Sequence, residues 1–256
     1  MGLPTPYYYL IKHPPGFVAN ISVNDVTFYR RYSDYHQAPN GPFNHWMVEG
    51  VNVVHLVLVQ ETPKPGMDFK FSMEILRFED DAPIFQMNFP QLLALHPPEE
   101  QALPVTHQTI FRFDEISPRP IWMDAPEADF PPEGNAEQRA VVAALHDAKS
   151  RGDLDDFIKL TEIKRTALER FYGPNPEETE AALRATYAPI LSEPWEVDPL
   201  DFNQLMFERR AGGRVAYVTR KDGGPALFAK HKTDPERTWE PTLYLTQVNG
   251  KWRIFL

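Results

Sequence analysis

The chain has 256 residues, of which 42% are hydrophobic and 24% are charged, a composition that supports a packed core and excludes wholesale disorder. Its 26 basic and 36 acidic residues give a formal net charge of −10, which argues against nucleic-acid binding because phosphate backbones are anionic. The absence of cysteine excludes disulfide scaffolds, thiolate zinc sites and cysteine nucleophiles. No export signal or bilayer-spanning apolar run is visible, so we expect a cytoplasmic protein with no membrane partner.

Residues 1–113 are rich in short runs of alternating or continuous apolar residues, which predict β-strands. Asn24-Asp25 separates two of these runs and is typical of a two-residue hairpin turn. The expected strands are Phe17–Val23, Val26–Arg30, Asn44–Val48, Asn52–Gln60, Asp68–Phe78, Pro83–Phe89 and Thr106–Phe113. We predict that they form an antiparallel β-sandwich of about seven or eight strands.

Residues 114–134 contain five prolines and many acids, which predicts an extended linker. Helical periodicity follows in residues 135–256. Asn135 and Gln138 predict a capping box at the start of a first helix, which should end before Gly152. Asp153 predicts the start of a second helix that ends at Gly173-Pro174. A third helix is expected over about 176–188, ending by Pro189. The strands expected after it are Phe202–Arg209, Val215–Arg220, Ala226–Lys230, Thr238–Val248 and Trp252–Leu256.

Charge and proline differ between the two halves of the chain. Residues 1–130 hold 8 basic and 16 acidic residues, a net charge of −8, whereas residues 131–256 hold 18 and 20, a net charge of −2. Of the 26 prolines, 18 precede residue 133. These differences predict an α+β protein of two domains: an acidic β-sandwich over 1–113, the linker 114–134, and an α+β domain over 135–256.

Two stretches of the second half resemble one family. Ala140–Leu160 (AVVAALHDAKSRGDLDDFIKL) is similar to the two opening helices of NTF2-like (SnoaL-like) domains, and Val248–Phe255 (VNGKWRIF) is similar to their last hairpin and strand. The resemblance implies helices packed on a curved antiparallel sheet, in the form of a cone. The expected third helix departs from the family pattern and would partly close the mouth of the cone.

The first half resembles accessory β-sandwich modules through Val23-Asn24-Asp25-Val26 and Glu49-Gly50-Val51-Asn52-Val53. The whole outline, acidic, cysteine-free and of two domains, is similar to the immunity proteins of bacterial type VI secretion systems. That resemblance implies a protein that binds a cognate secreted effector, for example a cationic nuclease toxin. Neutralisation would occur by covering the effector's active surface, without turnover, cofactor or metal.

Clustered carboxylates are the residue type that such a binding role needs, because a negative field steers a protein onto a basic partner. The candidate partner-binding residues lie in loops and in the expected linker. They are Glu79, Asp80, Asp81, Asp114, Glu115, Asp124, Glu127 and Asp129. The competing interpretation of each acidic run is an ordinary solvated surface.

An enzymatic or small-molecule-binding cone is the alternative function. The sequence has no phosphate-binding glycine loop, no His-Glu-x-x-His and no Gly-x-Ser-x-Gly. A pocket of the cone would instead draw on residues of the expected strands and the turn before them, with His231 paired to an acid or a tyrosine. The candidates are Asp201, Glu208, Tyr217, His231 and Tyr244.

Two further features leave alternatives open. Tyr7-Tyr8-Tyr9 is either an aromatic binding platform or a run that alternates between core and surface. His55 is either a buried general base or, as we expect, a core histidine bonded to a carbonyl.

Overall fold

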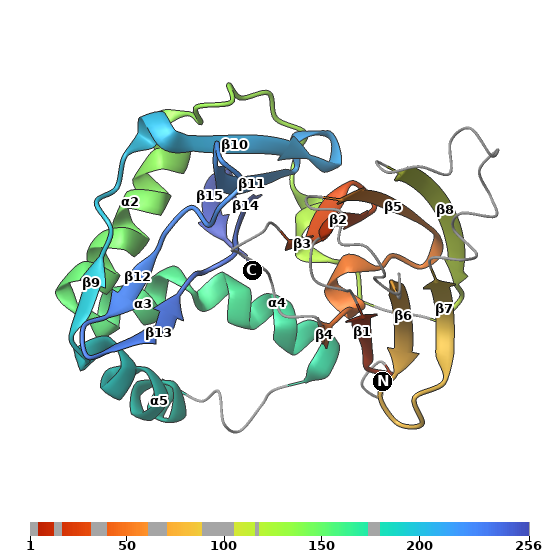
Figure 1. Cartoon of the computed structure of the whole chain (residues 1–256), viewed down its shortest axis with the longest axis horizontal. Helices are drawn as coiled ribbons and strands as arrows, with labels where there is room; N and C mark the ends of the chain where they lie inside the picture. The colour runs from red at the N-terminus through yellow and green to blue at the C-terminus, as the bar shows by residue number, and fades with distance from the viewer. Residues whose placement is uncertain are drawn as a thin grey trace. The chain divides into compact units, whose positions relative to one another are not determined.

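The computed structural model of the chain describes residues 5–12, 17–31, 40–60, 71–88, 105–115, 118–173 and 180–255. The chain divides into two compact units, Met1–Pro120 and Ile121–Leu256, coloured red to green and green to blue in Figure 1. The described residues form four antiparallel sheets and four α-helices, so the predicted α+β class is confirmed.

The first unit contains two four-stranded antiparallel sheets, in the orders β4-β1-β6-β7 and β3-β2-β5-β8. Its strands are β1 Tyr7–Lys12, β2 Phe17–Val23, β3 Val26–Arg31, β4 Asn40–Pro42, β5 Gly50–Gln60, β6 Ser72–Arg77, β7 Pro83–Asn88 and β8 Val105–Phe113. Aromatic pairs join the two sheets. The Tyr7 and Phe113 rings lie 5.3 Å apart, and those of Phe85 and Phe111 lie 5.4 Å apart.

The β2–β3 hairpin turns at Asn24-Asp25, as predicted. Both residues have positive φ, 51° and 64°, which the tight two-residue turn requires and which Asn and Asp tolerate. The Asn24 side chain donates to the buried Asn52 amide oxygen at 2.9 Å and accepts from the Val53 N–H at 3.1 Å. The turn therefore also fixes the start of β5.

Residues 44–48 do not form the predicted strand. Asn44–Trp46 is a single 3-10 turn, η1. The Asn44 side chain accepts from the Tyr7 N–H of β1 at 2.6 Å and donates to the Thr5 carbonyl at 2.8 Å, so a side chain and not a strand backbone bonds these groups. Sequence reasoning missed β1, which pairs antiparallel with β6, as well as the three-residue strands β4 and, in the second unit, Trp195–Val197.

The tyrosine run in β1 alternates between core and surface. Tyr7 and Tyr9 are buried, whereas Tyr8 is partly exposed. The binding-platform interpretation therefore does not apply to all three rings. His55 is exposed on β5, so the expected core histidine is wrong.

The second unit contains helices followed by two antiparallel sheets, in the orders β10-β11-β14-β15 and β13-β12-β9. Its helices are α2 Ala136–Arg151, α3 Leu154–Leu160, α4 Glu162–Tyr172 and α5 Glu180–Ser192. Its strands are β9 Trp195–Val197, β10 Leu205–Arg210, β11 Val215–Arg220, β12 Ala229–His231, β13 Asp234–Trp239, β14 Leu243–Val248 and β15 Lys251–Ile254. Short 3-10 turns lie at η3 Ile121–Asp124, η5 Phe202–Gln204 and η6 Ala211–Gly213.

The predicted helix boundaries are partly confirmed. Asn135 and Gln138 form a reciprocal capping box, Gly152 ends α2 at φ 65°, and Asp153 caps α3. The single second helix is wrong, because the Thr161 hydroxyl donates to the carbonyls of Phe157 and Ile158 and the chain breaks there into α3 and α4. Helix α5 also continues past Pro189 to Ser192.

The core of the second unit lies between α2 and one face of the sheet β10-β11-β14-β15. Val142, Leu145 and Ala148 of α2 belong to the same buried cluster as Phe207 and Leu245 of the sheet. Glu137 in the first turn of α2 accepts from the N–H of Trp252 at 3.1 Å, which gives the edge strand β15 a side-chain acceptor.

Residues 121–134, expected as part of a linker, pack on the second unit. Phe130 is buried in its core with its ring 5.4 Å from that of Trp252, and the Pro132 carbonyl accepts from the Phe207 N–H at 2.7 Å. The segment contains enough apolar side chains to dock, despite its prolines and acids.

Candidate functional site

Three of the predicted partner-binding acids lie together at the turn between β6 and β7. Glu79, Asp80 and Asp81 are all exposed. Asp80 lies 3.4 Å from the Arg77 guanidinium, and Asp81 accepts from the Tyr8 hydroxyl at 2.6 Å. The turn is therefore an ordered acidic loop of the first unit, with Glu79 as the acid that makes neither contact.

The other predicted acids do not join this cluster. In the first unit, Asp114 lies 3.1 Å from Arg112, and Glu115 accepts a hydrogen bond from the Tyr7 hydroxyl. Burial, together with Glu115, raises the pKa of Tyr7 to about 12. These two acids therefore already have partners within their own unit.

Asp124, Glu127 and Asp129 belong to the second unit, where each lies near an arginine. The pairs are Asp124–Arg170 at 3.9 Å, Glu127–Arg214 at 3.0 Å and Asp129–Arg209 at 2.9 Å. The eight acids thus lie on two units, and five of them pair with arginine in the folded protein.

The boundary between the units also changes the distribution of charge. Residues 1–120 hold 8 basic and 13 acidic residues, and residues 121–256 hold 18 and 23, so each unit has a net charge of −5. The larger negative charge counted for residues 1–130 arose because Asp124, Glu127 and Asp129 were counted with the N-terminal half. The negative field is therefore not concentrated in one unit.

The predicted pocket residues do not line one cavity. Glu208, Tyr217 and Tyr244 share one face of adjacent strands, and the two tyrosine rings stack at 4.8 Å. Strand alternation places this face opposite to the one packed on α2, because the core residues are their neighbours Phe207 and Leu245. Asp201 caps η5 beside a small cavity of about 110 Å³, and His231 lies on β12 in the other sheet.

His231 belongs instead to a cluster around Lys149, which sequence reasoning missed. Lys149 on α2 is 2% exposed, and its Nζ lies 3.9 Å from the Trp195 ring centroid and 5.4 Å from that of Trp239. The His231 ring meets Trp195 edge-on at 5.3 Å. Burial lowers the pKa of Lys149 to about 8. No sequence signal links these residues, which come from four separate elements.

Glu193 is the carboxylate of this cluster. Its Oε2 lies 2.8 Å from the Arg237 guanidinium and 3.8 Å from the His231 Nε2. The Lys149 ammonium makes no hydrogen bond in the described structure and is held by indole faces. The cluster therefore joins α2 to β9 and β13 around a buried amine.

A groove of about 720 Å³ lies between α2, α3, the start of α4 and the β14–β15 hairpin. Six apolar side chains line it: Val141, Ala144, Leu160, Ile163, Val248 and Ile254. None of the predicted site residues takes part in this groove. The sequence contained one indirect signal, the Gly152-Asp153 break, which separates α2 from α3, two of the helices that line the groove.

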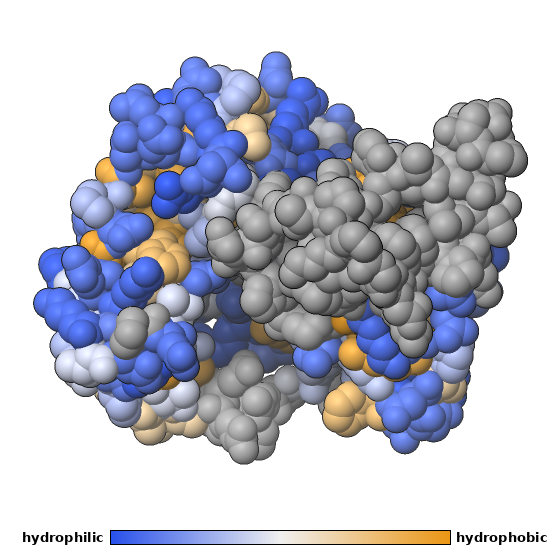
Figure 2. Space-filling view, in the orientation of Figure 1, coloured by the Kyte–Doolittle hydropathy of each residue, from blue (hydrophilic) through white to orange (hydrophobic). Residues whose placement is uncertain are grey.

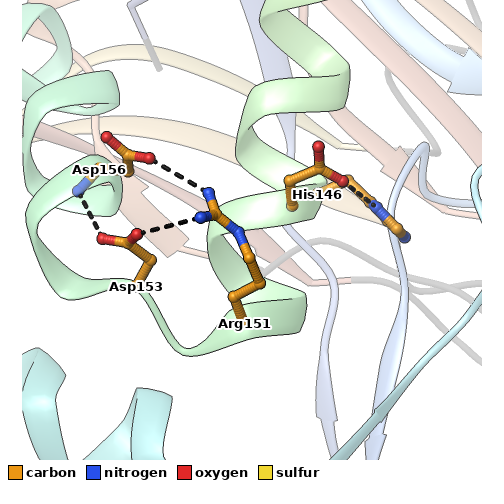
Figure 3. Close-up of polar contacts among 5 residues, drawn as sticks. His146, Arg151, Asp153 and Asp156 are labelled. Carbon is orange, nitrogen blue, oxygen red and sulfur yellow. Dashed lines mark hydrogen bonds and ion pairs between the residues drawn. The ribbon is translucent and has the colours of Figure 1, made fainter.

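Charged side chains of α2 and of the start of α3 make polar contacts at or beside the groove, and Figure 3 shows those of His146, Arg151, Asp153 and Asp156. Arg151 lies 3.4 Å from Asp153 and 3.2 Å from Asp156. His146 lies with its Nδ1 3.4 Å from Asp147 and its Nε2 2.9 Å from the Asp198 carbonyl, so both ring nitrogens are engaged. This histidine consequently links α2 to the segment that follows β9.

Comparisons of the chain with protein-family models, with curated proteins and with solved structures found no match. Among the described residues, no group of three or more His, Asp or Glu side chains is arranged to hold a metal ion. None of the helices in the described ranges is long and apolar enough to cross a membrane. Charged and polar side chains cover most of the described surface in the view of Figure 2, with smaller hydrophobic areas between them.

Proposed function

We propose that the second unit binds a small molecule in the groove between α2, α3, α4 and the β14–β15 hairpin. The observation that carries the proposal is the groove itself: about 720 Å³, with six apolar side chains and a charged rim. Small-molecule sites are typically concave, of about 300–1,000 Å³, and apolar with a few polar groups that orient the ligand.

We further propose that this unit has the NTF2-like arrangement of helices on a curved sheet. Supporting features are the α2–α3 break at Gly152-Asp153 and the closing hairpin, whose turn residues Asn249 and Gly250 both have positive φ. The extra helices and the separate sheet β13-β12-β9 depart from that arrangement. Many unrelated activities and non-enzymes use this fold, so the proposal rests on the groove and not on the fold.

Filling the groove tests the binding proposal. Ala144 lines the groove on α2, and Ala144→Trp would occupy it. The matched control is Ala140→Trp, at an exposed position one turn earlier on the same helix that does not line the groove. We expect native mass spectrometry of protein purified from its host to show a bound small molecule in wild type and Ala140→Trp and to show its loss in Ala144→Trp. Equal ligand content in all three proteins would overturn the proposal.

A second function, protein binding by the first unit, is favoured by Phe78. Its side chain is 69% exposed directly before the acidic turn, with its ring 6.3 Å from that of Tyr8. An exposed aromatic beside carboxylates is a suitable anchor for a basic protein surface. We propose on this basis that the chain could act as an immunity protein of a type VI secretion system, neutralising a cationic effector by covering its surface. Co-purification from the host with mass spectrometry identifies such a partner, and recovery of none contradicts this function.

A further inference from the structure

We propose that the groove of the second unit selects ligands with a singly charged anionic head and an apolar body. This inference rests on the proposed small-molecule function and specifies the class of ligand. It follows from which of the charged side chains around the groove already have partners in the folded protein and which do not.

Three cations at the groove are available to a ligand. Lys159 lies in the last turn of α3, and Lys251 and Arg253 lie on β15. None of the three has an ion pair or side-chain hydrogen bond to the part of the chain that the structure describes. Arg151, the fourth cation, is held by Asp153 and Asp156. The cations free to meet a ligand thus come from two elements on different sides of the groove.

The carboxylates at the groove are less available. Asp156 is paired with Arg151, and Asp147 lies beside His146. Glu162 lies in the first turn of α4, where the helix dipole stabilises a negative charge. The lining therefore carries four cations against three carboxylates, and the unpaired groups are mainly cations. A singly charged anion matches this excess better than a cation or a multiply charged group.

The apolar part of the lining favours a ligand with an apolar body. Burying methylene groups against apolar side chains is favourable, and the six apolar residues extend from α2 across to the hairpin. A carboxylate with a linear alkyl chain offers both parts. Decanoate, decanol and decyltrimethylammonium share a ten-carbon chain and differ in head charge, so their comparison separates recognition of the head from burial of the chain.

The test is isothermal titration of these three probes, below their critical micelle concentrations, into four full-length proteins. The proteins are wild type, Ala144→Trp, the double variant Lys159→Gln/Lys251→Gln, and the control Lys221→Gln/Lys232→Gln, which removes two exposed lysines elsewhere in the same unit. We expect decanoate to bind wild type and the control at least tenfold more tightly than the other probes. We expect the double variant to lose about tenfold in decanoate affinity, since each exposed ion pair with the carboxylate contributes only modestly.

The outcomes separate the two proposals. Two results would show that the charge selectivity is wrong: equal binding of all three probes, or an equal loss of affinity in both lysine double variants. In either case the groove remains a binding site if Ala144→Trp abolishes binding. If no probe binds, or if Ala144→Trp binds like wild type, then the groove does not take apolar ligands and both proposals are wrong. Circular dichroism of each variant shows whether the fold is retained.

Discussion

The ammonium of Lys149 lies 3.9 Å from the centroid of the Trp195 ring inside the second unit, and it forms no ion pair with a carboxylate of the described residues. Glu193, whose charge acts on Lys149, is bonded to Arg237 at 2.8 Å. A buried charge without a carboxylate partner is costly, and the indole faces offset only part of that cost, since a cation–π contact contributes about 0.5–2 kcal/mol. Lys149 should therefore lower the stability of the unit while it orients α2.

We expect Lys149→Met to stabilise the second unit. Methionine keeps the length and shape of the side chain and removes the desolvated charge, and replacing buried charges by apolar groups of similar volume is often stabilising by about 1–4 kcal/mol. Allowing for the lost cation–π contacts, the expected gain in unfolding free energy at pH 7 is about 1–2 kcal/mol. Urea denaturation measures it. The control is Lys232→Met, at an exposed lysine of the same unit, which should change the unfolding free energy by no more than about 0.5 kcal/mol. A lower unfolding free energy in Lys149→Met would show that the buried cation is net stabilising.

The same lysine predicts that the second unit gains stability in mild alkali. Its pKa is about 8 in the folded unit against the ordinary 10.5, so between these pH values the unfolded chain binds more protons. Unfolding free energy therefore rises with pH from about 8 to 10.5, and the cost of charging the buried amine is fully present below pH 8. Urea titrations across this range should show the rise in wild type and a flat profile in Lys149→Met. Parallel profiles in the two proteins would contradict it.

The first unit should respond to alkali in the opposite direction. Burial raises the pKa of Tyr7 and of Tyr9 to about 12, with Glu115 adding to the effect at Tyr7. Above pH 10 the unfolded chain loses these protons while the folded unit retains them, so stability falls as pH rises from about 10 to 12. Hydrogen exchange with mass spectrometry resolves the two units, and Tyr9→Phe should reduce the loss in the first unit. A loss of protection confined to the second unit would contradict this.

The local signals of the sequence were reliable where a few neighbouring residues determine the structure. The Asn24-Asp25 hairpin, the Asn135–Gln138 capping box and the Gly152 helix end are each decided by the backbone preferences of one or two residues. The Asn44 turn and the break at Thr161 were not predictable in this way. In both, a side chain competes with regular backbone hydrogen bonding.

The close contact between Ala128 and the glycine turn at 211–213 predicts that adding a side chain at Gly213 strongly destabilises the second unit. A Cβ atom at Gly213 would lie 1.9 Å from the Ala128 carbonyl oxygen, and the residue has a φ of 86°. We expect Gly213→Ala to destabilise the second unit by at least about 3 kcal/mol, through strain and the displacement of the docked segment. Gly250→Ala is the control, because it has a similar φ of 73° with open space around it, and it should cost about 1 kcal/mol. Thermal unfolding measures both, and equal losses would show that the close contact is unimportant.

The candidate site was largely beyond the sequence because it depends on which distant segments meet. Periodicity placed Val141 and Ala144 on the helical stripe, but not beside Lys251 and Arg253 of the last strand. Charge counting failed for a related reason. The position of the domain boundary decides which unit carries Asp124, Glu127 and Asp129, and the apolar side chains Ile121, Trp122 and Phe130 dock that segment on the second unit. Composition alone favoured a linker.

The β6–β7 turn gives the test of the remaining protein-binding hypothesis. If a partner is identified, the triple variant Glu79→Lys/Asp80→Lys/Asp81→Lys should slow association about tenfold at low salt and change dissociation little, because exposed charges act mainly on the rate of encounter. The matched control is Glu49→Lys/Glu133→Lys/Glu196→Lys, which changes the net charge equally at exposed acids outside the turn. Surface plasmon resonance at several salt concentrations measures both rates. Because each unit carries the same net −5, an equal slowing in both variants would mean that total charge, and not the acidic turn beside Phe78, attracts the partner.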